Sequence, residues 1–378
     1  MEINTDQVVQ DCFKAIKDKI ESLTTLNIIV AGKTGVGKST LINSVFRDNL
    51  AETGTGRPVT THLQRITKKG CPLVIYDTKG FELGKEVQSQ VKREIMGKIQ
   101  EGIASRDLNQ TIHCIWYCIN AASNRVEPEE IAWLRELGSE SEMSQVPIIV
   151  VLTQCISKKK AQEMRQIVDA ENLNVIQIVP VLAQDYEIDD DYVAKAFGLD
   201  VLIRVMMEAL PEELLDTLQN LQKVCLQEKI NRAQAAVAAA TALAAAEGAS
   251  PLPFSDAAAL IPTQVTMIAS IAVIFGIDVN KTVLAGFVST VLGTGGATIL
   301  GKTVVSNLIK MIPGAGSVVG GVISAGTAGV LTTALGESFI TVMTLIYKGE
   351  MTTSDFSTKE GKRRIREIFK EQMSASRA

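Results

Sequence analysis

The sequence predicts an α/β fold, with a doubly wound and mainly parallel sheet of the phosphate-loop type, followed by an all-helical region. Three observations predict it. Apolar, strand-like runs alternate with helical patterns up to residue 205, a glycine-rich loop follows the first run, and no strand pattern appears after residue 182. We therefore expect an N-terminal helix at residues 1–24, an α/β domain at 25–205 and a weakly apolar helical domain at 206–378.

Residues 1–24 have the spacing of an amphipathic helix. Apolar residues recur every three or four positions from Val8 to Leu23, and lysines and aspartates lie on the other face. The charged residues that interrupt this segment argue against a signal peptide. We expect the helix to pack against the helical domain or against the flank of the α/β domain, with membrane contact as the alternative.

Six apolar runs are predicted as strands of the α/β domain. The last three are continuously apolar, as expected for strands that are buried on both faces. The predicted strands are residues 26–31, 63–68, 72–77, 111–118, 146–152 and 175–181.

The segment after the first strand has the composition of a phosphate-binding loop. It fits the pattern Gly-x-x-x-x-Gly-Lys-Ser and leads into a helix. Its glycines let the backbone amides turn toward an anion, and the positive end of the helix adds to the attraction. Lys38 is expected to reach the outer phosphates, and the Ser39 hydroxyl to ligate Mg²⁺. The predicted phosphate-binding residues are Gly32, Lys33, Thr34, Gly35, Val36, Gly37, Lys38, Ser39 and Thr40.

A second motif, Asp77-Thr78-Lys79-Gly80, follows a short β-rich run. The aspartate is expected to hold Mg²⁺ through water, and the amide of the glycine to contact the γ-phosphate. A polar, glycine-rich segment between the motifs contains Thr60 and Thr61, and its composition is typical of a switch loop. One of these threonines is expected to complete the Mg²⁺ shell, and the sequence leaves open which. The candidate metal ligands are Ser39, Thr60, Thr61 and Asp77, and the catalytic candidates are Lys38, Thr60, Thr61 and Gly80.

On these motifs residues 25–205 resemble the G domain of Era-like and septin-like small GTPases, of the TRAFAC class, and are similar to immunity-related stress GTPases. The resemblance implies binding of GTP and GDP and hydrolysis of GTP. This family reads guanine with Asn/Thr-Lys-x-Asp after the fifth strand, whereas here Gln154 replaces the lysine and Ile156 the aspartate. Guanine selectivity therefore stays open, with ATP as an outside alternative. The base-binding candidates are Thr153, Gln154 and Ala183.

Two positions favour slow hydrolysis. Phe81 stands where some relatives place a water-orienting glutamine, and Gly35 stands where others carry a potassium-binding asparagine. The resemblance implies that a second G domain supplies the missing groups, so we expect a homodimer through the G domains. Arg57 and Arg125 are candidates to act across that interface, against the alternative of solvated surface arginines.

The helical domain contains three stretches without a charged residue, and each is about as long as the roughly 20 residues of a membrane span. Threonine, serine, glycine and proline dilute them, which favours a soluble bundle instead. Residues 215–350 resemble a helical domain of uncharacterised function that is attached to bacterial Era-like GTPases, which implies a cytoplasmic location and leaves membrane association open. Membrane insertion, a soluble bundle and an oligomerisation module all stay open. The stretches are Ala257–Ile277, Thr282–Gly301 and Met311–Gly336.

Composition excludes some other functions. The net charge of −4 argues against a nucleic-acid binder, and none is expected as a partner. The six cysteines lack zinc-like spacing and are expected to be free thiols, while His62 and His113 are expected to be structural. Three functions remain: a GTPase switch whose helical domain engages a membrane or partners, a nucleotide-binding scaffold with negligible hydrolysis, and a membrane-inserting helical effector under nucleotide control.

Overall fold

The computed structural model consists of two compact units. One is Leu23–Cys225, the first unit, and the other combines Met1–Ser22 with Leu226–Ala378, the second unit. The structure describes residues 5–47, 55–58, 60, 62–78, 84–123, 125–248, 260–292 and 325–376.

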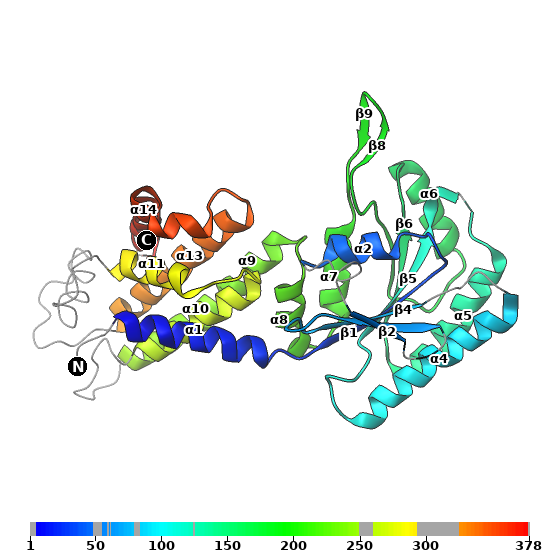
Figure 1. Ribbon diagram of the computed structural model, residues 1–378, viewed down its shortest axis with the longest axis horizontal. Coiled ribbons are helices and arrows are strands. Elements are labelled where there is room, and N and C mark those ends of the chain that lie inside the picture. The colour runs from blue at the N-terminus through cyan, green and yellow to red at the C-terminus, as the bar shows by residue number, and fades with distance from the viewer. Residues whose placement is uncertain are drawn as a thin grey trace, which may run out of the picture. The chain divides into compact units, whose positions relative to one another are not determined.

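The first unit is built on a seven-stranded sheet in the order β2-β3-β4-β1-β5-β6-β7 (Figure 1). The five strands from β4 to β7 in that order pair in parallel, and β2 and β3 add an antiparallel edge. This confirms the predicted doubly wound, mainly parallel fold, although β2 was not predicted. The strands are β1 (Leu26–Ala31), β2 (Thr55–Pro58), β3 (Leu63–Thr67), β4 (Leu73–Thr78), β5 (Cys114–Asn120), β6 (Ile148–Thr153) and β7 (Gln177–Pro180).

Helices cover both faces of this sheet, and every residue of its central strands β1 and β6 is buried. Alternate residues of β1 point to opposite sides: Ile28 lies in the core under α2, α7 and α8, and Ile29 in the core under α4, α5 and α6. A short 3₁₀ helix, η1 (Ala121–Ser123), follows β5. The helices are α2 (Lys38–Val45), α4 (Gly84–Ser105), α5 (Pro128–Ser144), α6 (Lys158–Asp169), α7 (Leu199–Ala209) and α8 (Glu212–Leu221).

The first unit extends to Cys225 rather than ending at the expected boundary of residue 205, because α8 packs into its core. Leu214, Leu218 and Leu221 recur on one face of α8 and are buried with the sheet residues. The Thr217 hydroxyl also donates a hydrogen bond of 2.7 Å to the carbonyl of Thr24.

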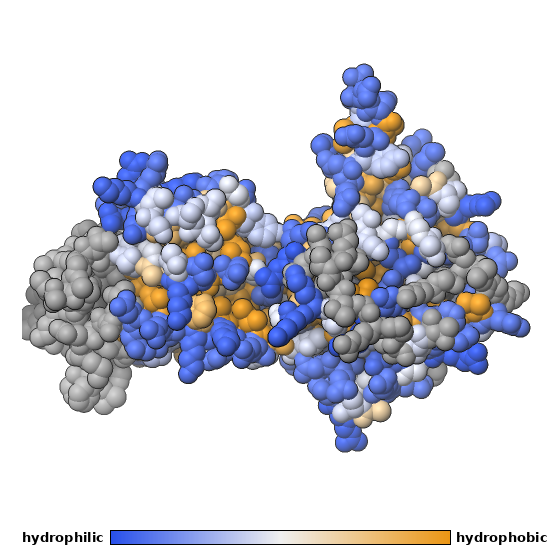
Figure 2. All heavy atoms as spheres, viewed as in Figure 1, coloured by the Kyte–Doolittle hydropathy of each residue, from blue (hydrophilic) through white to orange (hydrophobic). Residues whose placement is uncertain are grey.

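A two-stranded antiparallel hairpin projects from the first unit (Figure 1). It consists of β8 (Tyr186–Asp189) and β9 (Tyr192–Ala194), and its tip is hydrophilic (Figure 2). The prediction that strands end at residue 182 was wrong here. All four residues of β8 are exposed, so it lacks the continuous apolar run on which the prediction of the inner strands relied.

The second unit is helical, as predicted. Its α13 packs along α9, and α1 packs on α10 and α11, which decides between the two sites expected for the N-terminal helix. Gly336 allows the close contact of α13, because a Cβ there would lie 2.5 Å from the Val237 side chain. The elements are α1 (Thr5–Glu21), α9 (Leu226–Gly248), α10 (Ile261–Phe275), α11 (Lys281–Leu292), α13 (Ala325–Tyr347), a short 3₁₀ helix η3 (Thr353–Ser357) and α14 (Lys359–Ala375).

Among the described residues one helix is long and apolar enough to cross a membrane, by length and composition. The stretch is Ala328–Tyr347 of α13, and half of it is buried inside the structure. The core helix of a soluble helical bundle can have the same length and the same apolar composition. Residues 293–301 and 311–324 of the two expected stretches Thr282–Gly301 and Met311–Gly336 lie outside the described residues.

Candidate functional site

The loop between β1 and α2 has the backbone geometry of an anion cradle. Gly32, Gly35 and Gly37 have positive φ angles of 143°, 76° and 92°. Glycine is required at the first of these, because a Cβ on Gly32 would lie 2.5 Å from the carbonyl oxygen of Cys118 on β5. The residue at the N-cap of α2 is Gly37, which has no side chain to accept a hydrogen bond. The backbone amides of the first turn of α2 therefore have no side-chain acceptor at the cap position.

Lys38 lies across this loop. Its ammonium donates hydrogen bonds of 2.9 Å to the carbonyl of Gly32 and 3.0 Å to the carbonyl of Lys33. The positive charge is thereby held beside the uncapped end of α2. Ser39 and Thr40 follow on the exposed side of the first helical turn, and Thr34 is exposed at the tip of the loop.

Lys33 is directed toward α5 instead. Its ammonium lies 2.7 Å from a carboxylate oxygen of Glu127 and 3.6 Å from one of Glu130. Glu130 also accepts a hydrogen bond of 3.1 Å from the buried hydroxyl of Tyr117. Burial raises the pKa of Glu130, although the charge of Lys33 and the Tyr117 hydroxyl act in the opposite direction. The predicted phosphate-binding residue Lys33 thus joins the loop to the start of α5.

Two predicted base-binding residues brace the loop from the end of β6. The hydroxyl of Thr153 lies 2.5 Å from the carbonyl of Val36 and 3.1 Å from that of Ile119, in a buried position. The side-chain amide of Gln154 donates a hydrogen bond of 2.8 Å to the carbonyl of Gly35. Gln154 therefore occupies the lysine position of the expected guanine motif while contacting the phosphate loop itself.

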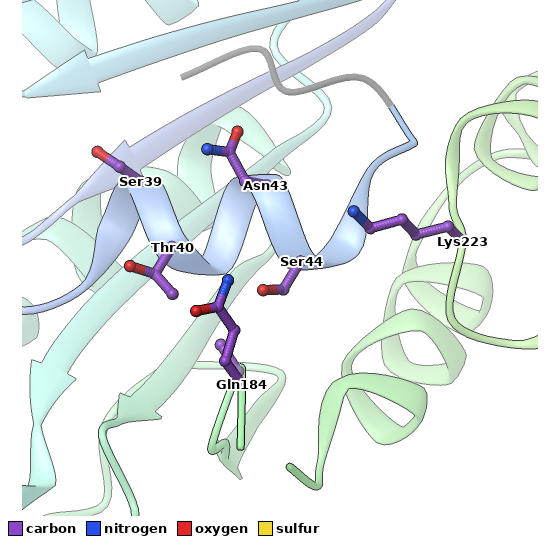
Figure 3. Close-up of a pocket in the computed structure, with 7 residues that line it drawn as sticks. Ser39, Thr40, Asn43, Ser44, Gln184 and Lys223 are labelled. Carbon is purple, nitrogen blue, oxygen red and sulfur yellow. The ribbon is translucent and has the colours of Figure 1, made fainter. Parts of the chain in front are cut away.

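A cavity of about 520 Å³ lies along the polar face of α2 (Figure 3). The loop after β7 closes one side, and Lys223, which follows α8, closes the end. Of its lining, sequence reasoning predicted Ser39, Thr40 and Ala183 and missed the others. The i, i+3 and i+4 spacing of polar residues after Thr40 is the signal that indicates this face. We call it the α2 cavity; it is lined by Ser39, Thr40, Asn43, Ser44, Ala183, Gln184 and Lys223.

Asp77 lies at the carboxyl end of β4, in register with Val30 of β1, next to the strand that leads into the phosphate loop. Burial raises the pKa of the nearby Cys118 thiol to about 12; the charge of Lys38 lowers it and that of Asp77 raises it further. Ser39 and Asp77 together supply a hydroxyl and a carboxylate, the oxygen ligands that suit Mg²⁺. The described residues contain no cluster of three or more His, Cys, Asp or Glu side chains that would form a metal site alone.

The hydroxyl of Thr60 contacts α4, because it donates a hydrogen bond to the carboxylate of Glu94 on that helix. The same carboxylate accepts the backbone amide of His62 at 3.1 Å and faces its ring nitrogen at 3.2 Å. Burial alone would raise the pKa of Glu94, but the hydrogen bonds from Thr60, His62 and Gln90 lower it overall. Thr61 and Gly80, the other two switch candidates, lie outside the described residues, as does Phe81.

The described residues hold the histidines and cysteines outside any cluster of metal ligands. The ring of His113 is buried and accepts a hydrogen bond of 3.0 Å from the amide of Asn27. Burial lowers the pKa of His113 to about 4. All six cysteines are free thiols.

Comparison with known protein families gives one match in each half of the chain. Residues 27–154 match the family of 50S ribosome-binding GTPases, and residues 211–377 match a domain of unknown function (DUF697). The second match begins just before α8, which the structure packs into the core of the first unit.

Individual relatives match only part of this chain. Human septin-9 is 25% identical over 208 residues, which cover 49% of this chain and 34% of septin-9. Translocase of chloroplast 90 of Arabidopsis thaliana is 33% identical over 113 residues, which cover 28% of this chain and 14% of the translocase. The chain thus spans about a third or less of the length of these relatives. A solved structure of a probable GTP-binding protein engB matches with 18% identity and a TM-score of 0.31, over 48% of this chain and 97% of that one.

Proposed function

We propose that this chain joins a GTPase domain of the Era-like and septin-like class to a DUF697 domain. On that premise it is a slow, Mg²⁺-dependent GTPase switch. The helical domain engages a membrane or a partner protein according to the nucleotide bound. The observation that carries the proposal is the ammonium of Lys38, which is held within a glycine cradle beside the uncapped amides of α2.

These groups account for the binding of a triphosphate. The loop amides and the first turn of α2 donate hydrogen bonds to phosphate oxygens, and Lys38 exchanges its two carbonyl partners for phosphate. Ser39 and Asp77 are the residues that hold Mg²⁺, which when bound neutralises charge on the phosphates. Thr153 and Gln154 keep the loop in shape through the carbonyls of Val36 and Gly35.

Slow hydrolysis follows because the described part of the site has few side chains that can orient the attacking water molecule. Gly35 has no side chain for this role, and the hydroxyl of Thr60 is hydrogen-bonded to Glu94. Charge stabilisation by Lys38, Mg²⁺ and the amides then remains as the main catalytic effect. A second G domain that adds polar groups across a dimer interface speeds the reaction, so the turnover per molecule rises with protein concentration.

Nucleotide binding is tested by titrating a fluorescent GTP analogue into the full chain with Mg²⁺ or with a chelator. Lys38→Ala is expected to weaken binding at least about tenfold, since it removes a charge-assisted hydrogen bond. Lys159→Ala, which removes an exposed lysine of α6, is the matched control and is expected to bind as the parent does. Equal affinity of Lys38→Ala and the parent would refute the assignment of the loop.

Self-association is tested by the initial rate of phosphate release per molecule, measured over a hundredfold range of protein concentration. We expect the rate per molecule to rise with concentration. A rate that stays constant contradicts the dimer. The absence of turnover at every concentration favours the nucleotide-binding scaffold instead.

A membrane-inserting effector is the second candidate, and the apolar stretch Ala328–Tyr347 of α13 favours it. Flotation of the full chain with anionic vesicles, in GTP, GDP and no nucleotide, separates the possibilities. Co-flotation that resists high salt and carbonate extraction indicates insertion, whereas co-flotation that salt reverses indicates surface engagement.

A further inference from the structure

Two separate elements hold the phosphate loop. From the end of β6, the hydroxyl of Thr153 and the side-chain amide of Gln154 bond to the carbonyls of Val36 and Gly35. The other contact comes from the start of α5, which meets the loop through the side chain of Lys33. The loop is therefore attached to its surroundings at both its first and its later residues.

The start of α5 is a fixed anchor for this second contact. The indole of Trp133 donates a hydrogen bond of 3.0 Å to the carbonyl of Gln88 on α4, and its ring centroid lies 5.2 Å from that of Tyr117. Glu127 directly precedes α5, and its carbonyl accepts the amide of Glu130 at 2.9 Å. The two carboxylates thus project from a backbone that other contacts already hold in place.

The burial of Glu130 shows that these carboxylates do more than suit the helix dipole. Acidic residues are favourable at the positive end of any helix, and an exposed one such as Glu129 is sufficient for that role. Glu130 is only 6% exposed and lies 3.6 Å from the ammonium of Lys33 and 3.1 Å from the hydroxyl of Tyr117. A buried carboxylate is costly without a cation, so Lys33 is the partner that its charge requires.

The two lysines of the loop differ in what a move toward phosphate would cost. Lys38 exchanges only neutral groups, the carbonyls of Gly32 and Lys33. Lys33 would break its contact of 2.7 Å with Glu127 and leave the carboxylate of Glu130 buried without its cation. Breaking a buried ion pair by removal of one partner is strongly unfavourable. We therefore expect Lys33 to stay on α5 when nucleotide binds.

We infer that Lys33 is a positioning residue that binds α5 instead of phosphate, and that Glu127 and Glu130 brace the phosphate loop through it. The brace fixes the backbone of residue 33, whose carbonyl holds the ammonium of Lys38 at 3.0 Å. A cradle that is fixed beforehand loses less conformational freedom when its ligand binds. This inference rests on the proposed function and gives its phosphate site a support that the loop motif does not contain.

The two possible roles of Lys33 predict opposite effects for one substitution. If Lys33 were a phosphate ligand, Glu127→Gln would release its ammonium and strengthen nucleotide binding. If Lys33 is a brace, the same substitution loosens the loop and weakens binding. The side chain of Glu127 is half-exposed, so we expect a modest loss of about threefold in affinity.

The experiment is a titration of a fluorescent GTP analogue, with Mg²⁺, into the full chain as parent, Glu127→Gln, Lys33→Met and the double variant. Each single variant is expected to bind about threefold more weakly. The double variant is expected to bind no more weakly than Lys33→Met, because both substitutions break the same brace. Glu129→Gln, which changes the net charge equally at an exposed position of α5, is the matched control. Lys33→Arg keeps the ion pair and is expected to stay within about twofold of the parent.

The outcomes separate this inference from the proposed function. If the parent chain does not bind the analogue, the proposed function fails and the inference falls with it. If the parent binds, and Glu127→Gln binds as tightly as Glu129→Gln or more tightly, the inference alone is overturned. Additive losses in the double variant also overturn it, since Lys33 would then act on the nucleotide independently of α5. Glu127→Gln decides the main question even if Lys33→Met fails to fold.

Discussion

The hydroxyl of Thr60 donates its hydrogen bond to the carboxylate of Glu94, and the amide of Leu63 donates to the same hydroxyl at 3.1 Å. The threonine in the expected switch loop is thus joined to α4 and to the start of β3. In the proposed function, Glu94 would compete with the Mg²⁺ site for the side chain of Thr60.

Replacing Glu94 by Gln removes the negative charge of the side chain that accepts hydrogen bonds from Thr60, His62 and Gln90. We expect the first unit to lose about 1–3 kcal/mol of stability at pH 7, because charge-assisted hydrogen bonds are replaced by weaker ones. Denaturant unfolding followed by tryptophan fluorescence measures it, since both tryptophans, Trp116 and Trp133, lie in this unit.

The pH dependence of the same variant gives an independent check. The pKa of Glu94 is lowered from 4.5 in the folded state, so its stabilisation is complete above about pH 4.5 and is lost as the pH falls through the folded value. The difference between the parent and Glu94→Gln is therefore expected to shrink in acid. A difference that stays constant from pH 7 to pH 3 would contradict the role of the charge.

Gly32→Ala and Gly35→Ala form a matched pair in the phosphate loop. Both glycines have positive φ, and that strain costs roughly 1–2 kcal/mol in each variant. A Cβ on Gly32 would also collide with the Cys118 carbonyl at 2.5 Å, whereas a Cβ on Gly35 meets no atom within 4 Å. We expect Gly32→Ala to destabilise the first unit clearly more in the same unfolding assay. Equal losses would show that the contact with β5 is unimportant.

Thr153→Val keeps the shape of a buried side chain and removes its hydroxyl. The carbonyls of Val36 and Ile119 then lose a partner, at an expected cost of about 1–3 kcal/mol. Because one of these carbonyls belongs to the phosphate loop, affinity for nucleotide is expected to fall as well. Isothermal titration calorimetry measures the affinity, and Thr153→Ser, which keeps the hydroxyl, is the control.

His113 is predicted to make the first unit sensitive to acid. Its pKa falls from 6.5 to about 4 on folding, so the unfolded chain binds more protons between these values. Stability is complete above about pH 6.5 and decreases as the pH falls to about 4, by about 3 kcal/mol in total. His113→Asn, whose side chain can still accept the amide of Asn27, is expected to show a flatter profile. An unchanged profile would contradict this assignment.

The inner sheet and the phosphate loop were predictable because their signals are local. Ile28 and Ile149 belong to continuous apolar runs, and Lys38 belongs to a motif with fixed spacing that follows a strand. Such patterns need no knowledge of distant contacts.

Other features depend on tertiary packing, which a linear pattern does not record. The apolar face of α8 fits either unit, and burial of Leu214 and Leu218 with the sheet decides for the first one. The pairing of Thr60 with Glu94 joins residues that are 34 positions apart. Lys223 likewise reaches the α2 cavity only because its backbone pairs with the end of that helix. None of these contacts has a signature at the level of composition or spacing.

The assignment of α1 to the second unit has a consequence for biosynthesis. Val9, Cys12 and Ile16 are translated before Leu23–Cys225, yet their partners α10 and α11 are translated only after the whole of it. A nascent chain must therefore keep this apolar stripe soluble while an entire domain is made. A truncated protein meant to isolate the first unit should begin at residue 23, since one that retains α1 would expose the apolar face that α10 and α11 otherwise bury.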